Sequence, residues 1–271
     1  MVKAYEGVKI QAILSFIIGT LGLLGNFYLL ARLLKKHQQF YILVKTLVCF
    51  DVLFIGLSIA IQVDNFIDVG FEAEKWLYPC IHVAMVGTIY VTILMSFERC
   101  WMLTNCHTIK PLMFWFLYLA TIMFTILFNI PKFLEFNVNI GSDILGLVPL
   151  YKKIYTTWIE LIFTCFVPII GLLVLNGMVL HKISKVERGI CTKQDEDEQD
   201  LIFATKFNIL IVLWFVVGHF SRWILDFYQL YHGEMRADKF TPTWIQNCVY
   251  ASNVLLTLRS SVNFFVYVML K

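Results

Sequence analysis

The sequence has few charged residues. Only 15% of its 271 residues are Asp, Glu, Lys or Arg, whereas 59% are hydrophobic. Soluble domains carry about 25% charged and roughly 45–50% apolar residues. A soluble chain of this length could not bury so much apolar surface in one core. The composition therefore excludes an ordinary soluble domain and predicts an integral membrane protein in contact with a lipid bilayer.

Several functional signatures are missing as well. The net charge is only +3 and no basic stripe suggests nucleic acid as a partner. The seven cysteines form no Cys-x-x-Cys pair, and neither metal-spaced histidines nor clustered carboxylates occur. We therefore expect no enzyme, no catalytic residues, no metal and no cofactor. The last apolar segment has no internal lysine for a retinal Schiff base.

Long apolar segments dominate what is present. A hydrocarbon core takes about 20 helical residues to cross, and seven segments reach that length. The sequence predicts one all-α domain over residues 1–271, a bundle of seven transmembrane helices. Their expected ranges are approximately 8–34, 39–63, 75–104, 110–135, 154–185, 199–232 and 241–270.

The orientation follows from the lysines and arginines of the short loops, which favour the cytoplasm. Arg32, Lys35 and Lys36 follow the first helix, and five basic residues lie at positions 182–206 after the fifth. The loop between the second and third helices has one lysine against four acidic residues. These counts predict an outer N-terminus and a cytoplasmic C-terminus, although two lysines at positions 152–153 count against it.

Polar side chains occur at one depth on several of these helices. A charge in the middle of a bilayer costs about 2.5–3.5 kcal/mol, so each one retained needs a reason. Asp51 and Arg259 both lie roughly 17–18 Å from the inner ends of their helices, at 1.5 Å per residue. Asn26, Thr88 and Asn263, with Ser260 beside Arg259, complete the expected layer. The layer is either a switch with two arrangements or a fixed polar link between helices.

Short motifs on the expected helices resemble the markers of rhodopsin-like receptors in order and spacing. They are Gly25-Asn26, Leu47-x-x-x-Asp51, Glu98-Arg99-Cys100, Pro168 and Asn263-Phe264-x-x-Tyr267. Longer segments resemble the invertebrate FMRFamide and related neuropeptide receptors: IYVTILMSFER at 89–99, FNIPKFLEF at 128–136, GHFSRWILDFY at 218–228 and RSSVNFFVY at 259–267. The resemblance implies a class A, G-protein-coupled receptor of the plasma membrane that binds an extracellular, amidated, FMRFamide-like peptide and activates a heterotrimeric G protein.

The resemblance also implies roles for individual residues. Arg99 would face the G protein in the active state and be restrained by Glu98 in the inactive state. Asn263 and Tyr267 would rearrange on activation. His219 would contact the floor of the ligand site, the alternative being a buried core histidine with satisfied hydrogen bonds. Pro168 would bend the fifth helix, because a proline inside a helix removes a backbone hydrogen bond.

Further ligand contacts are expected near the outer ends of the helices. The end of an Arg-Phe-amide peptide needs a carboxylate partner and an aromatic slot. Asp226 and Glu160 are the candidate carboxylates, and Trp244 and Arg222 lie on the same side. The alternative for such acidic residues is an ordinary solvated surface.

The sequence departs from the receptor pattern at two informative places. Glu74 stands where the family has the cysteine of its outer disulfide, so that bond cannot form there, and a bond between Cys80 and Cys248 is the alternative to consider. Arg259 stands where relatives carry Asn, in a layer that can hold a sodium ion. We therefore expect an ion pair between Asp51 and Arg259 and a receptor insensitive to sodium.

Two other functions remain open for the same fold. Divergent nematode chemosensory receptors, which take small-molecule ligands, look much alike. A non-signalling relic is the second alternative, because the outer disulfide is missing.

Overall fold

A computed structural model describes residues 2–67, 74–105, 107–136, 152–186, 195–232 and 243–270. Every regular element in these ranges is helical, and seven helices are long and apolar enough to cross a membrane. The predicted fold class is confirmed. In chain order the elements are α1 (Val2–Leu33), α2 (Gln39–Ile67), α3 (Glu74–Asn105), α4 (Pro111–Phe136), η1 (Lys152–Ile159), η2 (Ile162–Phe166), α6 (Val167–Val186), α7 (Asp195–His232) and α8 (Thr243–Leu270).

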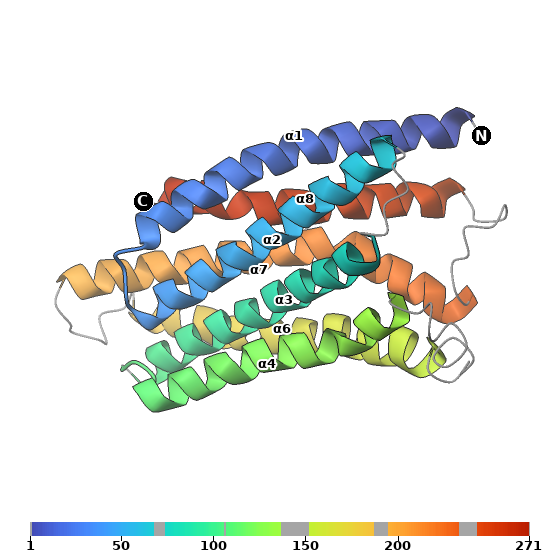
Figure 1. Cartoon of the computed structure of the whole chain (residues 1–271). Coiled ribbons are helices and arrows are strands. Elements are labelled where there is room, and N and C mark those ends of the chain that lie inside the picture. Colours follow the sequence, from blue (N-terminus) through green and yellow to red (C-terminus); the bar gives the residue numbers. More distant parts are fainter. Residues whose placement is uncertain are drawn as a thin grey trace.

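The helices pack side by side in one bundle, with the N-terminus of α1 and the C-terminus of α8 at opposite ends (Figure 1). Helix α3 is central, because it contacts α2, α4, α6 and α7. Large apolar side chains such as Phe116 on α4 and Leu24 on α1 are exposed at the periphery. In a membrane protein such side chains face the lipid, whereas the buried charged and polar side chains face the interior of the bundle.

Helices α1 and α8 pack closely, and a glycine makes this possible. A Cβ atom at Gly22 would lie 2.5 Å from the Cβ of Ser261 and 3.0 Å from its Cα. Small residues let helix backbones approach in membranes, where association depends on packing. The Ser261 hydroxyl, in turn, donates a 3.2 Å hydrogen bond to the carbonyl of Ile18 on α1.

The fifth membrane segment is less regular than the single helix expected over 154–185. Two π-helical stretches, η1 and η2, precede α6, which begins one residue before Pro168. Pro168 has no N–H group, so in the wide π register the carbonyl of Phe163 loses its backbone donor five residues later. The hydroxyl of Tyr90 on α3 donates to that carbonyl at 2.9 Å. The carbonyl left without a backbone donor by Pro168 is therefore satisfied by a side chain of α3.

Candidate functional site

A buried ion pair joins α2 to α8. Asp51 is fully buried and Arg259 is 5% exposed, and Nη1 of the arginine lies 3.4 Å from Oδ1 of the carboxylate. The side-chain amide of Asn263, one turn along α8, donates to the other carboxylate oxygen. Both oxygens of Asp51 are therefore engaged by α8, as a buried carboxylate requires.

Helix α7 lies directly against the arginine of this pair. A Cβ atom at Gly218 would lie 2.7 Å from the Cβ of Arg259, so only a glycine permits this approach. The Arg259 guanidinium carbon also lies 5.6 Å from the ring centroid of Phe215 on α7. The Arg259 side chain therefore contacts both α2 and α7.

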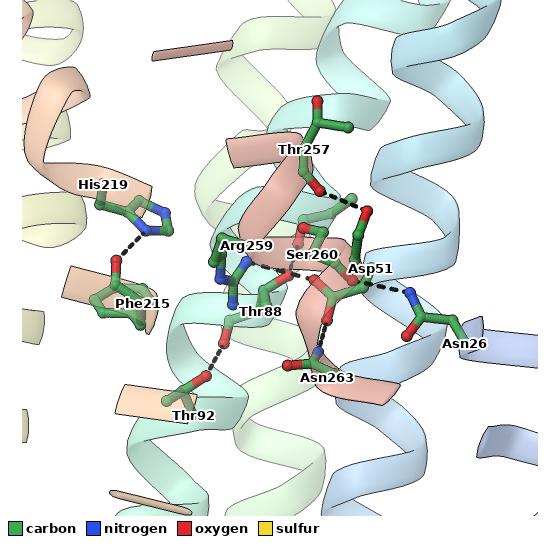
Figure 2. A network of polar contacts seen from close by, with 12 residues as sticks. Asn26, Asp51, Thr88, Thr92, Phe215, His219, Thr257, Arg259, Ser260 and Asn263 are labelled. Atoms are coloured by element: carbon green, nitrogen blue, oxygen red, sulfur yellow. Dashed lines mark hydrogen bonds and ion pairs between the residues drawn. The ribbon is translucent and has the colours of Figure 1, made fainter. Parts of the chain in front are cut away.

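The other expected members of the polar layer surround the pair (Figure 2). Asn26 on α1 donates a 2.9 Å hydrogen bond to the backbone carbonyl of Ser260, which ties a third helix to the layer. Thr88 on α3 lies near the Asp51 carboxylate, and its hydroxyl donates to the carbonyl of Ala84 on its own helix. The structure thus brings together polar groups of α1, α2, α3 and α8.

A second charged pair lies near the C-terminal end of α3. Nε and Nη2 of Arg99 donate to the two oxygens of Glu98, each at 2.5 Å, and both side chains are buried. The guanidinium also lies 4.4 Å from the ring centroid of Phe40. The Phe40 ring meets Phe207 of α7 edge-on, and Phe207 meets Tyr267 of α8 in the same way. An aromatic chain therefore connects Arg99 to the helices on which Phe207 and Tyr267 lie.

His219 is buried beside the polar layer. Its Nδ1 lies 3.0 Å from the carbonyl of Phe215, which requires the proton on that nitrogen, and its ring lies 4.2 Å from the Phe215 ring. Since Arg259 lies over the same Phe215 ring, the histidine and the arginine share one aromatic neighbour (Figure 2).

Near the other end of the bundle, Glu160 is the centre of a buried cluster from three elements. Lys132 on α4 lies with Nζ 2.9 Å from one carboxylate oxygen, and His82 on α3 has Nδ1 3.6 Å from the other. Arg222 on α7 is close enough to act electrostatically on both Glu160 and His82. Of the expected ligand contacts, Glu160 and Arg222 therefore lie near each other, with Lys132 and His82 as neighbours that the sequence did not indicate.

The other expected ligand contacts are Trp244 and Asp226. Trp244 on α8 is exposed, and its ring meets that of Tyr228 on α7 edge-on at 5.5 Å. The side chain of Asp226 lies outside the described part of the chain, although its backbone is within α7. Cys80 and Cys248 are free thiols, so the alternative disulfide between them is not formed.

Two comparisons with known proteins give a consistent result. The chain is 22% identical to an FMRFamide receptor of Drosophila melanogaster, in an alignment that covers 94% of this chain and 50% of that receptor. It therefore spans about half the length of this relative. Its fold is similar to that in the crystal structure of squid rhodopsin, with a TM-score of 0.73 and 13% identity over 96% of this chain and 81% of rhodopsin.

No protein-family profile matches the chain. The fold and the sequence similarity together support a multi-pass plasma-membrane protein of the rhodopsin-like, class A type of G-protein-coupled receptor, close to the FMRFamide receptors.

Proposed function

We propose that the chain is a receptor with an outer N-terminus that binds an extracellular amidated peptide and activates a heterotrimeric G protein. The observation that carries the signalling part is the Glu98–Arg99 pair. Arg99 is 4% exposed and makes two 2.5 Å bonds to the neighbouring carboxylate. A buried arginine held by one carboxylate is a group that a conformational change can release to a partner, at the inner end of α3.

The polar layer supplies a route from the ligand end to that arginine. Asp51 is bound by Arg259 and Asn263 of α8, and Arg259 packs on Gly218 and Phe215 of α7. A ligand that shifts α7 therefore has to change the packing around Arg259, and interfaces of this kind have discrete arrangements. Asn263 and Tyr267 lie one turn apart on α8. The same helix therefore contacts Asp51 through Asn263 and the ring of Phe207 through Tyr267.

The residues proposed to bind the ligand are Glu160 and its neighbours, together with His219, Arg222, Asp226 and Trp244. A guanidinium of a ligand would compete with Lys132 for the Glu160 carboxylate, because Lys132 holds it at 2.9 Å. The similarity to an FMRFamide receptor favours an Arg-Phe-amide peptide as this ligand.

The test is a calcium or cAMP response in cells that express the full chain, challenged with a panel of Arg-Phe-amide and related amidated peptides. A saturable response that Arg99→Ala abolishes supports the proposal. Arg32→Ala is the matched control, since Arg32 is exposed and bonds only to Tyr28 of its own helix among its described contacts. Silence with confirmed surface expression would contradict the proposal and favour a small-molecule chemosensory receptor or a non-signalling protein.

A further inference from the structure

Four lysines occur at the end of the bundle where α1 ends and where α2 and α4 begin. They are Lys35 and Lys36 after α1, Lys45 on α2, and Lys110 directly before α4, and we call them the lysine corner. Lys35 and Lys110 are exposed. Residues 7–50 and 99–134, which contain both helix connections and the helix ends beside them, include no aspartate or glutamate. The lysines therefore have no acidic residue near them in the sequence.

Hydrogen bonds hold the two connections together at this end (Figure 1). The side-chain amide of Gln39, the first residue of α2, donates to the carbonyl of Ile109 at 2.8 Å. This bond fixes the residue before Lys110 to the start of α2. Nζ of Lys45 donates to the carbonyl of Lys36 at 3.0 Å, which fixes the α1–α2 turn to α2 as well. Lysines that are far apart in the sequence therefore lie at one corner of the bundle.

Two helix N-termini add to the positive charge of the lysine corner. Helix α2 begins at Gln39 and α4 begins at Pro111. The first backbone N–H groups of a helix have no partner within it, and with the helix dipole they favour anions such as phosphate. Among the acidic side chains that the structure describes, Glu98 is the one at this end, and Arg99 already binds it. The corner therefore favours an anionic partner.

The lysine corner also lies at the edge of the lipid-facing surface. Leu34, directly before Lys35, is 65% exposed, and Leu112, two residues after Lys110, is 86% exposed. A soluble anion would leave these leucines in water, whereas a phospholipid covers them with its chains while its headgroup contacts the lysines. Basic clusters of about this size beside a membrane helix are typical of sites for anionic lipid headgroups. The surroundings therefore favour a lipid over a soluble partner.

Arg32 is close in sequence but does not belong to the lysine corner. Its Nε donates to the hydroxyl of Tyr28 at 2.8 Å, and its guanidinium carbon lies 5.2 Å from the centroid of the same ring. Tyr28 precedes Arg32 by about one helical turn. The arginine side chain is therefore folded back along α1, away from the connection to α2.

We propose that the lysine corner binds the headgroup of a polyphosphorylated inositol phospholipid. Lysine ammonium groups bind phosphate as point charges. Several phosphate groups on one headgroup can engage several lysines, whereas a lipid with a single negative charge engages fewer of them. The inference rests on the proposed outer N-terminus, which places this end of the bundle at the cytoplasmic leaflet. It requires neither a peptide ligand nor a G protein.

The direct test is native mass spectrometry of the purified full chain in a neutral detergent, titrated with short-chain phosphatidylinositol bisphosphate. The mass of each adduct identifies the bound lipid, and the titration gives its affinity. We expect saturable binding of this lipid. Removal of one lysine beside a headgroup weakens binding by about fivefold, so Lys35→Gln combined with Lys110→Gln weakens it by about 25-fold.

Lys206→Gln is the matched control, because Lys206 is an exposed lysine on α7 outside the lysine corner, and we expect unchanged affinity. The pair Lys35→Arg and Lys110→Arg keeps both charges and is expected to retain binding. Every changed side chain is exposed, so the melting temperatures are expected to match that of the unmodified chain. Unchanged affinity in the double glutamine variant would overturn the site.

Competition identifies the source of the phosphate groups. Equal occupancy by phosphatidylserine at the same concentration would overturn the assignment to inositol phospholipids. Displacement of the lipid by an equal concentration of soluble inositol trisphosphate would overturn the assignment to a lipid. Because the measurement uses no peptide and no G protein, its failure would leave the proposed function intact. Lipid binding by a chain that responds to no peptide would contradict the proposed function alone.

Discussion

The guanidinium of Arg259 lies 3.4 Å from the carboxylate of Asp51, midway along the spans of α8 and α2. Each charge compensates the other in a place where both side chains are buried. The positive charge of the layer is therefore part of the chain and is covalently fixed to α8. Because Arg259 also packs against Gly218, the same charge is coupled to the position of α7.

This arrangement predicts that ligand binding does not respond to sodium. Agonist affinity is expected to be unchanged when sodium is replaced by potassium, because Arg259 already neutralises Asp51. In Arg259→Asn the carboxylate loses its cation, and sodium is expected to shift agonist affinity by about fivefold or more. Radioligand competition in the two salts measures both. A strong sodium effect on the unmodified chain would contradict the interpretation.

The close packing of α1 on α8 predicts a stability effect at Gly22. Gly22→Ala puts a methyl group 2.5 Å from the Cβ of Ser261, and overpacking of this kind costs about 1–3 kcal/mol. Gly171→Ala on α6 is the control, since an added methyl group there meets nothing within 4 Å. Thermal unfolding in detergent compares the two. Equal melting temperatures would show that α1 and α8 are not packed as described.

The contact between Arg99 and Phe40 predicts a change in basal signalling. A desolvated cation–π contact stabilises by about 2 kcal/mol, so its loss frees Arg99 more often. Phe40→Leu is expected to raise ligand-independent signalling several-fold. Phe116→Leu on α4 is the control, because Phe116 is 71% exposed and faces the lipid. Basal activity that falls or stays constant in Phe40→Leu would refute a restraining role for Phe40.

The Lys132–Glu160 pair predicts a non-additive effect on stability. Removal of one partner of a buried pair costs about 3–5 kcal/mol, since the other charge is left uncompensated. Lys132→Met and Glu160→Gln are each expected to lower the melting temperature, and the double variant to recover much of the loss. A thermal-melt double-mutant cycle measures this. Strictly additive losses would mean that the 2.9 Å contact does not couple the two residues.

The polar layer could be predicted because the depth of a residue in the membrane depends only on its position along its own helix. The fixed rise of a helix converts residue counts into depth, so Asp51, Arg259 and Asn263 could be assigned to one level before any packing was known. The seven spans and the all-α fold followed in the same way from the lengths of the apolar segments. Neither inference needs the rotation of a helix about its axis.

Contacts that depend on helix rotation could not be predicted in this way. Lys132 and His82 surround Glu160 because three helices turn these faces toward one another, and no sequence spacing relates them. The hydrogen bond between Asn176 of α6 and Asn208 of α7 depends on helix rotation in the same way, so the sequence did not indicate it. Pro168 indicated a missing hydrogen bond, but the π-helical turns before it, and the donation by Tyr90, depend on the neighbouring α3.

We propose that this chain activates a G protein when an amidated peptide binds. Nucleotide exchange on purified heterotrimeric G proteins, with the full chain in nanodiscs, tests it without other cellular components. We expect an amidated Arg-Phe peptide to accelerate exchange in the unmodified chain and in Arg32→Ala, and we expect Arg99→Ala to remove the acceleration. Exchange that no peptide of the panel changes, or that Arg99→Ala leaves intact, would contradict it.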